Sequence, residues 1–139
     1  MNAIDTNVLV YFIDADEPVK RLQATELLER LGEEGTETVL PWQVAGEFLS
    51  CLRRWENEGR IKRDDTLQHM NQLESTFPLI IPAQSILRMS LDLSSRYSLS
   101  HWDSMLLAAC IEAGVDTLYT EDLDADTTYG SVRIENPFG

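Results

Sequence analysis

The sequence is poor in basic residues. It has 24 acidic residues against 11 lysines and arginines, which gives a formal net charge of −13. Because nucleic-acid phosphates are bound by lysine and arginine, this composition argues against a broad nucleic-acid-binding surface. Cysteine is also scarce, since only Cys51 and Cys110 are present. Two cysteines exclude a disulfide framework, and we expect both as buried free thiols in a reducing compartment.

Long apolar segments and several common motifs are also absent. No apolar run approaches the ~20 residues that a membrane span needs. No basic segment precedes an apolar one at the start of the chain, as a signal peptide would require. We therefore expect a cytoplasmic protein without membrane contact. A glycine-rich phosphate loop and a Gly-x-Ser-x-Gly elbow are missing, which leaves nucleotide kinases and serine hydrolases unsupported.

The chain has the length and patterning of one globular domain over residues 1–139. It is 43% hydrophobic and 25% charged, which is ordinary for a globular protein with a proper core. Short apolar segments alternate with helical patterns. The strands are expected near residues 3–4, 38–40, 78–81, 117–120 and 131–134. This alternation predicts the α/β class, as a three-layer α/β/α sandwich around a mainly parallel sheet of four to five strands.

Two acidic residues follow expected strands directly. Asp5 comes after Ala3-Ile4, and Asp122 follows the strand near 117–120. Open α/β sheets present their chemistry at the carboxyl ends of their strands, which favours a functional site. The alternative for Asp5 is a helix N-cap, a role that Thr6 or Asn7 could take instead. This stretch alone supports both interpretations.

Glu47 falls within an apolar helical stripe. Its neighbours at helical spacing include Val44, Phe48 and Cys51, so we expect Glu47 on the buried face. A buried glutamate requires a partner, which Arg53 or Arg54 could supply. Without such a partner, Glu47 would indicate a site.

Asp103 also lies beside an apolar stripe, formed by Leu106, Leu107 and Cys110. It stands three residues after Ser100, where the second member of a capping box is found. Asp103 could therefore cap the helix, bind a cation, or do both.

Four carboxylates could thus converge at one edge of the sheet. Crowded carboxylates repel and raise one another's pKa unless a cation neutralises them. All-oxygen ligands suit Mg²⁺, with Mn²⁺ also plausible. Such a site can activate a water molecule and stabilise the leaving oxygen of a phosphodiester.

Four segments, in this order, resemble the PIN domain family, and the chain is most similar to the VapC-type toxins of bacterial toxin–antitoxin modules. They are Ala3–Tyr11, Gly46–Phe48, Ser98–Ser104 and Leu118–Leu123. The resemblance covers the whole chain and includes the ending Ile134–Phe138, which is common in one subgroup.

The resemblance implies a metal-dependent endoribonuclease. The family's catalytic and metal-binding acids then match Asp5, Glu47, Asp103 and Asp122, with Thr6 and Asn7 supporting the first. It also implies a homodimer and neutralisation by a small antitoxin protein that docks near the active site. After Asp122 many relatives have a glycine-containing turn, whereas this chain continues Leu-Asp-Ala-Asp. The roles of Glu121, Asp124 and Asp126 are therefore open.

RNA binding by so acidic a chain requires a local basic patch. Five of the eleven basic residues lie between Arg53 and Arg63, and we take Arg60, Lys62 and Arg63 as the candidate RNA contacts. The alternative for this stretch is a solvated helix end and loop.

Two other functions compete with a ribonuclease. A metal-dependent phosphatase would use Asp-x-Asp after the first strand, but the second position here is Asn7, so the proton donor is missing. A catalytically inactive PIN-like binding module would retain only the partner contact, and the presence of all four acids argues against it.

Overall fold

The computed structural model describes residues 1–139 and contains one six-stranded sheet and six helices. The elements in chain order are β1 (Asn2–Ile4), α1 (Thr6–Ile13), α2 (Pro18–Glu33), β2 (Thr38–Pro41), α3 (Trp42–Asn57), α4 (Arg63–Thr76), β3 (Leu79–Ile80), α5 (Ile86–Tyr97), α6 (His101–Ala113), β4 (Thr117–Tyr119), β5 (Thr128–Tyr129) and β6 (Val132–Glu135). None of the helices has both the length and the apolar character needed to cross a bilayer.

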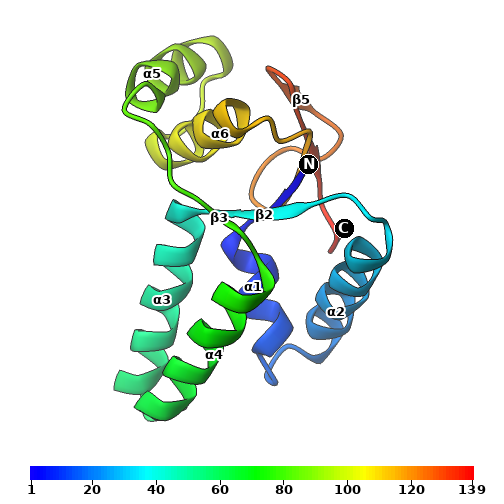
Figure 1. The fold of residues 1–139 in the computed structure, drawn as a ribbon, viewed down its shortest axis with the longest axis vertical. Helices are drawn as coiled ribbons and strands as arrows, with labels where there is room; N and C mark the ends of the chain where they lie inside the picture. Colours follow the sequence, from blue (N-terminus) through cyan, green and yellow to red (C-terminus); the bar gives the residue numbers. More distant parts are fainter.

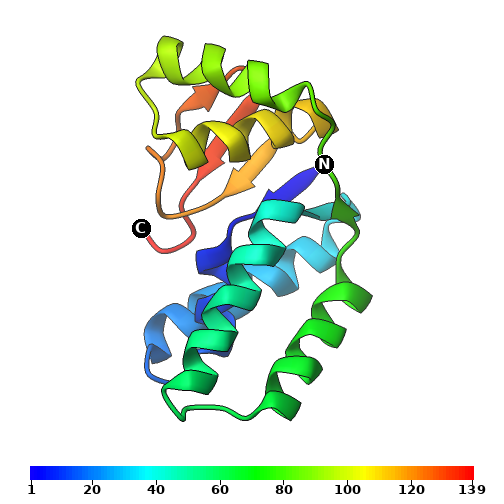
Figure 2. The ribbon, with the colours of Figure 1, turned by 90° about the vertical axis from the view of Figure 1, so that its left-hand side faces the viewer.

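The strand order is β3-β2-β1-β4-β6-β5. The chain moves outward from β1 through β2 to β3, then returns to the other side of β1 to form β4. Since parallel crossovers are right-handed, this reversal puts α1–α4 on one face of the sheet and α5 and α6 on the other. Figures 1 and 2 show these two helical layers on opposite sides of the strands. The predicted three-layer α/β/α fold is confirmed.

The predicted sheet is confirmed, with one additional strand. β1, β2, β3, β4 and β6 pair in parallel, as expected from the five apolar segments. The sixth strand, β5, has only two residues and pairs antiparallel with β6. Gly130 has a φ of +59° in the connecting turn, a conformation that favours glycine.

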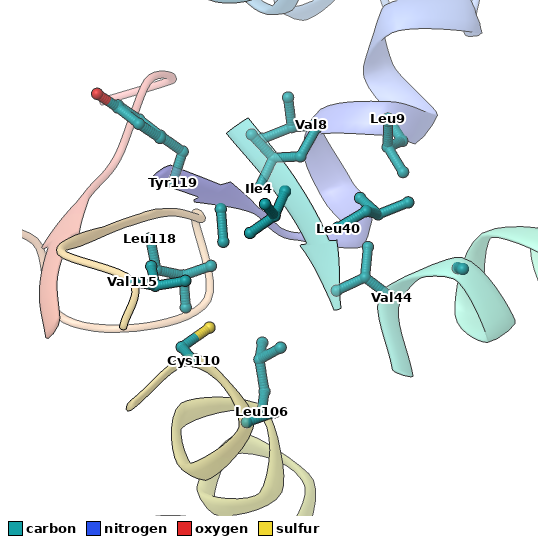
Figure 3. Close-up of a cluster of buried hydrophobic side chains, with 14 of the residues drawn as sticks. Ile4, Val8, Leu9, Leu40, Val44, Leu106, Cys110, Val115, Leu118 and Tyr119 are labelled. Carbon is teal, nitrogen blue, oxygen red and sulfur yellow. The ribbon is translucent and has the colours of Figure 1, made fainter. Parts of the chain in front are cut away.

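The hydrophobic core lies on both faces of the sheet and consists of 29 buried residues. Figure 3 shows part of it, in which Leu106 and Cys110 of α6 lie across the strands from Val8 of α1 and Val44 of α3. Cys51 and Cys110 are both buried free thiols, as predicted. Because helices cover both faces, the adjacent ends of β1 and β4 are held rigidly at the point where the strand order reverses. In open α/β sheets this switch point is where ligands bind.

Candidate acidic site at the ends of β1 and β4

Asp5 occupies the junction between β1 and α1. It is 6% exposed, and it is itself the N-cap of α1, so the cap does not fall on Thr6 or Asn7. Asp5 Oδ1 accepts a hydrogen bond from the backbone N–H of Thr6 at 2.7 Å, and Oδ2 accepts one from the hydroxyl of Thr120 at 2.8 Å. The two interpretations of this stretch are therefore compatible, because one carboxylate caps the helix and also faces the switch point.

Burial raises the pKa of Asp5 from 3.8 to about 6. The hydrogen bonds from Thr120 and Thr6 oppose this rise, whereas the negative charges of Asp122 and Glu47 add to it. No lysine or arginine forms an ion pair with Asp5. Asp5 is thus a desolvated carboxylate without a cation beside it.

Thr120 joins the two strand ends and was not predicted as a site residue. It follows β4 and is fully buried. Its hydroxyl donates to Asp5 and accepts from the backbone N–H of Asp122 at 3.1 Å and from the Asn7 amide at 3.3 Å. A single oxygen therefore orders residues from both sides of the switch point. The only signal in the sequence was a hydroxyl residue at the end of an apolar strand.

Asp122 lies at the exposed side of the same junction. The Asn7 side chain donates to its Oδ2 at 3.2 Å. The pKa of Asp122 is raised, mainly by burial, and the nearby negative charges of Glu121, Asp103 and Glu47 contribute to the rise. The structure thus places two further predicted acids within electrostatic range of Asp122.

Glu47 is exposed, which corrects the prediction that it lies on the buried face of its helix. Its spacing places it at the border of the apolar stripe of α3. The hydroxyl of Thr6 donates to Glu47 Oε2 at 2.8 Å, and Gln43 donates to Oε1 at 3.0 Å. Neither Arg53 nor Arg54 pairs with it. Thr6 and Asn7 each donate to one of the other acids, Glu47 and Asp122, rather than only supporting Asp5.

Asp103 lies in the first turn of α6. Ser100 is the N-cap, as expected, and accepts from the backbone N–H of Asp103 at 3.3 Å. The side chain of Asp103 makes no hydrogen bond in return, so the second half of the capping box does not form. Its carboxylate is therefore free to bind a ligand.

The chemistry of the donors at this junction fits a hard divalent cation. Four carboxylates face one region without a basic partner, and the buried amide oxygen of Asn7 has no hydrogen-bond donor. As the side chains lie, however, no three Asp, Glu, His or Cys residues are close enough together to hold a metal ion. Binding would require partly exposed acids such as Glu47 and Asp122 to turn toward Asp5.

Two neighbouring acids have other partners. Glu121 accepts from the hydroxyl of Tyr11 at 2.6 Å and pairs with Lys20 at 3.2 Å. Asp126 pairs with Arg133 at 3.1 Å. These contacts brace the loop after β4 and give both carboxylates a structural role.

The predicted RNA contacts lie away from the acids. Arg60 pairs with Asp14 and Asp16, at 3.0 Å each, and Arg63 pairs with Glu56 at 2.7 Å. Lys62 is exposed without an ion pair. Arg60 follows the end of α3, and that end, Asn57, is roughly 15 Å along the helix from Glu47.

An apolar cavity is also separate from the acids. It has a volume of about 700 Å³ and lies between α1, α2 and α4, with Leu9, Phe12, Leu31, Phe48 and Phe77 among its lining residues. None of the four predicted acids lines it. Its apolar walls suit a hydrophobic segment better than a phosphodiester.

The comparisons with known proteins agree with this fold. A PIN domain family model matches residues 3–130. No curated protein matches the sequence. The fold is similar to a toxin–antitoxin complex from Klebsiella pneumoniae, at 21% identity with a TM-score of 0.67 over 95% of each chain. It is also similar to VapC20 of Mycobacterium tuberculosis, a sarcin–ricin-loop-cleaving toxin, at 15% identity with a TM-score of 0.64 over 88% of this chain and 90% of that one.

A third solved structure covers nearly the entire chain. VapBC-1 from nontypeable Haemophilus influenzae matches at 10% identity with a TM-score of 0.70, over 99% of this chain and 98% of that one. At these identities the solved structures show a shared fold, and the family model supplies the family. The chain belongs to the PIN domain family.

Proposed function

We propose that this protein is a metal-dependent endoribonuclease and the toxin of a type II toxin–antitoxin module. The observation that carries the proposal is the buried carboxylate of Asp5 at the switch point, which has no basic partner and is acted on by the negative charges of Asp122 and Glu47. The similarity to VapC toxins supports ribonuclease activity, and the all-oxygen donor set supports Mg²⁺, with Mn²⁺ as an alternative.

In this proposal Asp5, Glu47, Asp103 and Asp122 hold the cation. When bound, the cation lowers the pKa of a water molecule and stabilises the leaving oxygen of the phosphodiester. Thr120 and the Thr6 N–H keep Asp5 ionised and oriented, because their hydrogen bonds favour its charged form. Thr6 and Asn7 orient Glu47 and Asp122 in the same way. Glu47, which is exposed, accepts a proton from the attacking water in this proposal.

The test is cleavage of RNA by the purified chain in the presence of Mg²⁺ or Mn²⁺. Asp5→Asn is expected to abolish cleavage and to leave the circular dichroism spectrum unchanged. Glu121→Gln is the matched control, since Glu121 lies beside Asp122 but pairs with Lys20. Retained metal-dependent cleavage by Asp5→Asn would reject the assignment. A phosphatase would instead hydrolyse a generic phosphate ester, and an inactive binding module would cleave neither substrate.

The toxin role adds two partners to the proposal, a small antitoxin protein and a second copy of the chain in a homodimer. Two of the structural neighbours are toxin–antitoxin complexes, which supports the first. The apolar cavity between α1, α2 and α4 suits an amphipathic helix of the antitoxin. Expression of the chain in the bacterial cytoplasm should arrest growth, and Asp5→Asn should relieve the arrest. Light scattering of the purified protein tests the dimer.

A further inference from the structure

The loop that carries Asp122 has no regular secondary structure. It follows β4 as a series of bends and turns over residues 121–126. Segments of this kind are usually mobile unless neighbouring side chains hold them. The position of the Asp122 carboxylate therefore depends on the side chains that pack around the loop.

Helix α1 contacts this loop at two levels, one helical turn apart. Asn7 donates to Asp122 Oδ2 at 3.2 Å, and the hydroxyl of Tyr11, on the same face of the helix, donates to Glu121 Oε1 at 2.6 Å. The hydrogen bond to Glu121 raises the pKa of Tyr11, so its hydroxyl stays protonated and acts as the donor. Because Glu121 and Asp122 are consecutive, fixing the first restricts where the second can lie.

Two further side chains hold the ring of Tyr11. Lys20 of α2 donates to the Tyr11 hydroxyl at 3.1 Å and to Glu121 Oε2 at 3.2 Å, and its ammonium lies 4.5 Å from the centroid of the Tyr11 ring. Phe138, in the segment after β6, packs edge-on against the same ring, with centroids 4.9 Å apart and an interplanar angle of 75°. These contacts limit rotation of the ring and keep the hydroxyl directed at Glu121. We call Tyr11, Lys20, Glu121 and Phe138 the Tyr11 cluster.

The far end of the loop has a weaker anchor. There Asp126, 81% exposed, pairs with Arg133 at 3.1 Å. Ion pairs as exposed as this one contribute little to stability. Glu121 is only 24% exposed and accepts from two donors, so the Tyr11 cluster is the stronger side-chain anchor of the loop.

We propose that the Tyr11 cluster positions Asp122 for cation binding, with Tyr11, Lys20 and Phe138 acting through Glu121 as positioning residues. The inference rests on the proposed function, since it concerns how one of the cation's ligands is held. Residues that orient metal ligands contribute about 10- to 100-fold to metal affinity. Glu121→Gln retains an oxygen that can accept from the Tyr11 hydroxyl, so the cluster stays closed in that variant.

The first test needs no metal. The backbone N–H of Asp122 donates to the Thr120 hydroxyl at 3.1 Å, and its hydrogen exchange, followed by nuclear magnetic resonance in a chelator, reports whether the loop is held. Tyr11→Phe and Phe138→Ala should each accelerate this exchange by about tenfold, a factor typical of losing one hydrogen bond to a charged group. Tyr97→Phe is the matched control, because its hydroxyl accepts one hydrogen bond from the backbone of Gly130, away from the loop.

The second test is binding of Mn²⁺, measured by electron paramagnetic resonance of the free ion. Tyr11→Phe and Lys20→Gln should each weaken Mn²⁺ binding by about tenfold. Lys20→Arg should restore it, whereas Arg21→Gln, which removes an unpaired cation from the same helix, should not change it. Excess Mn²⁺ should largely restore RNA cleavage by Tyr11→Phe, since a bound cation holds Asp122 in place of the cluster.

A double-mutant cycle tests whether Tyr11 acts through Glu121. Glu121→Ala removes the acceptor, so adding Tyr11→Phe to it should not weaken Mn²⁺ binding further. Additive losses would show that the hydroxyl acts by another route and would overturn the proposal.

Two other results would also overturn it. One is unchanged Asp122 exchange and unchanged Mn²⁺ affinity in Tyr11→Phe and Phe138→Ala. The other is an equal effect of Tyr97→Phe, which would mean that any loss of stability loosens the loop. Failure of the ribonuclease assignment is separate, because the unmodified protein would then cleave no RNA, whereas the exchange of the Asp122 amide is measured without metal or substrate.

Discussion

Asp5→Asn should stabilise the metal-free protein at neutral pH, although it removes a helix cap's charge. In the fold the pKa of Asp5 is about 6, against 3.8 for an ordinary aspartate. The difference corresponds to about 3 kcal/mol of unfolding free energy. Since the pKa is raised, protonated Asp5 is tolerated in the fold. Ionised Asp5 lowers the free energy of unfolding. This loss is absent below pH 3.8, grows as the pH rises toward 6, and reaches its full value above pH 6.

Asparagine has the shape of aspartate but cannot ionise, so the variant avoids this cost. Its advantage should reach about 3 kcal/mol at pH 7.5 and fall to about half of that at pH 5. Urea denaturation followed by circular dichroism, with a chelator present, measures both values. Glu29→Gln on α2 is the control for removing one negative charge. It is exposed and unpaired, and should change stability by less than about 0.5 kcal/mol at either pH.

A variant that is less stable than the unmodified protein at pH 7.5 would refute this reasoning. So would an advantage that does not change with pH. In either case the role of Asp5 would be chiefly that of a structural cap. Adding Mg²⁺ should remove most of the variant's advantage, because a bound cation stabilises only the chain that retains the carboxylate.

Three further predictions concern the same site. Thr120→Val removes the hydroxyl that lowers the pKa of Asp5, so the acidic limb of the pH–activity profile should move to higher pH by about one unit; Thr120→Ser should restore it. Saturating Mg²⁺ should raise the melting temperature of the unmodified protein, with about 2.7 kcal/mol of stabilisation at a hundredfold excess over Kd, and chelation should remove the gain. Glu121→Gln should leave the cleavage rate within about twofold but lower the melting temperature, since Glu121 contacts Lys20 and Tyr11 rather than the acids. A large loss of cleavage would place Glu121 in the site.

The sheet could be predicted because its parallel strands are short apolar segments, and the central strand β1 is buried on both faces. β5 could not, since Thr128–Tyr129 has no apolar run and forms only by pairing with β6 across a glycine turn. The placement of Asp5 and Asp122 at strand ends followed from the same pattern.

The surroundings of the acids were harder to predict. Helical spacing shows which side of α3 carries Glu47, but not where the apolar face ends, and Glu47 lies just beyond it. The roles of Arg60 and Thr120 depend on contacts with residues 46 and 115 positions away, which no local pattern contains.

The hydrogen bond between Thr120 and Asp5 also has a consequence for synthesis of the protein. β1 leaves the ribosome before β4, which is completed only after more than a hundred further residues have been added. Pairing over such a separation is slow and requires both strands. A chain released early by interrupted translation therefore carries Asp5 without Thr120 or Asp122. Its acidic pocket cannot form, so only a polypeptide that extends past β4 can acquire the assembled site.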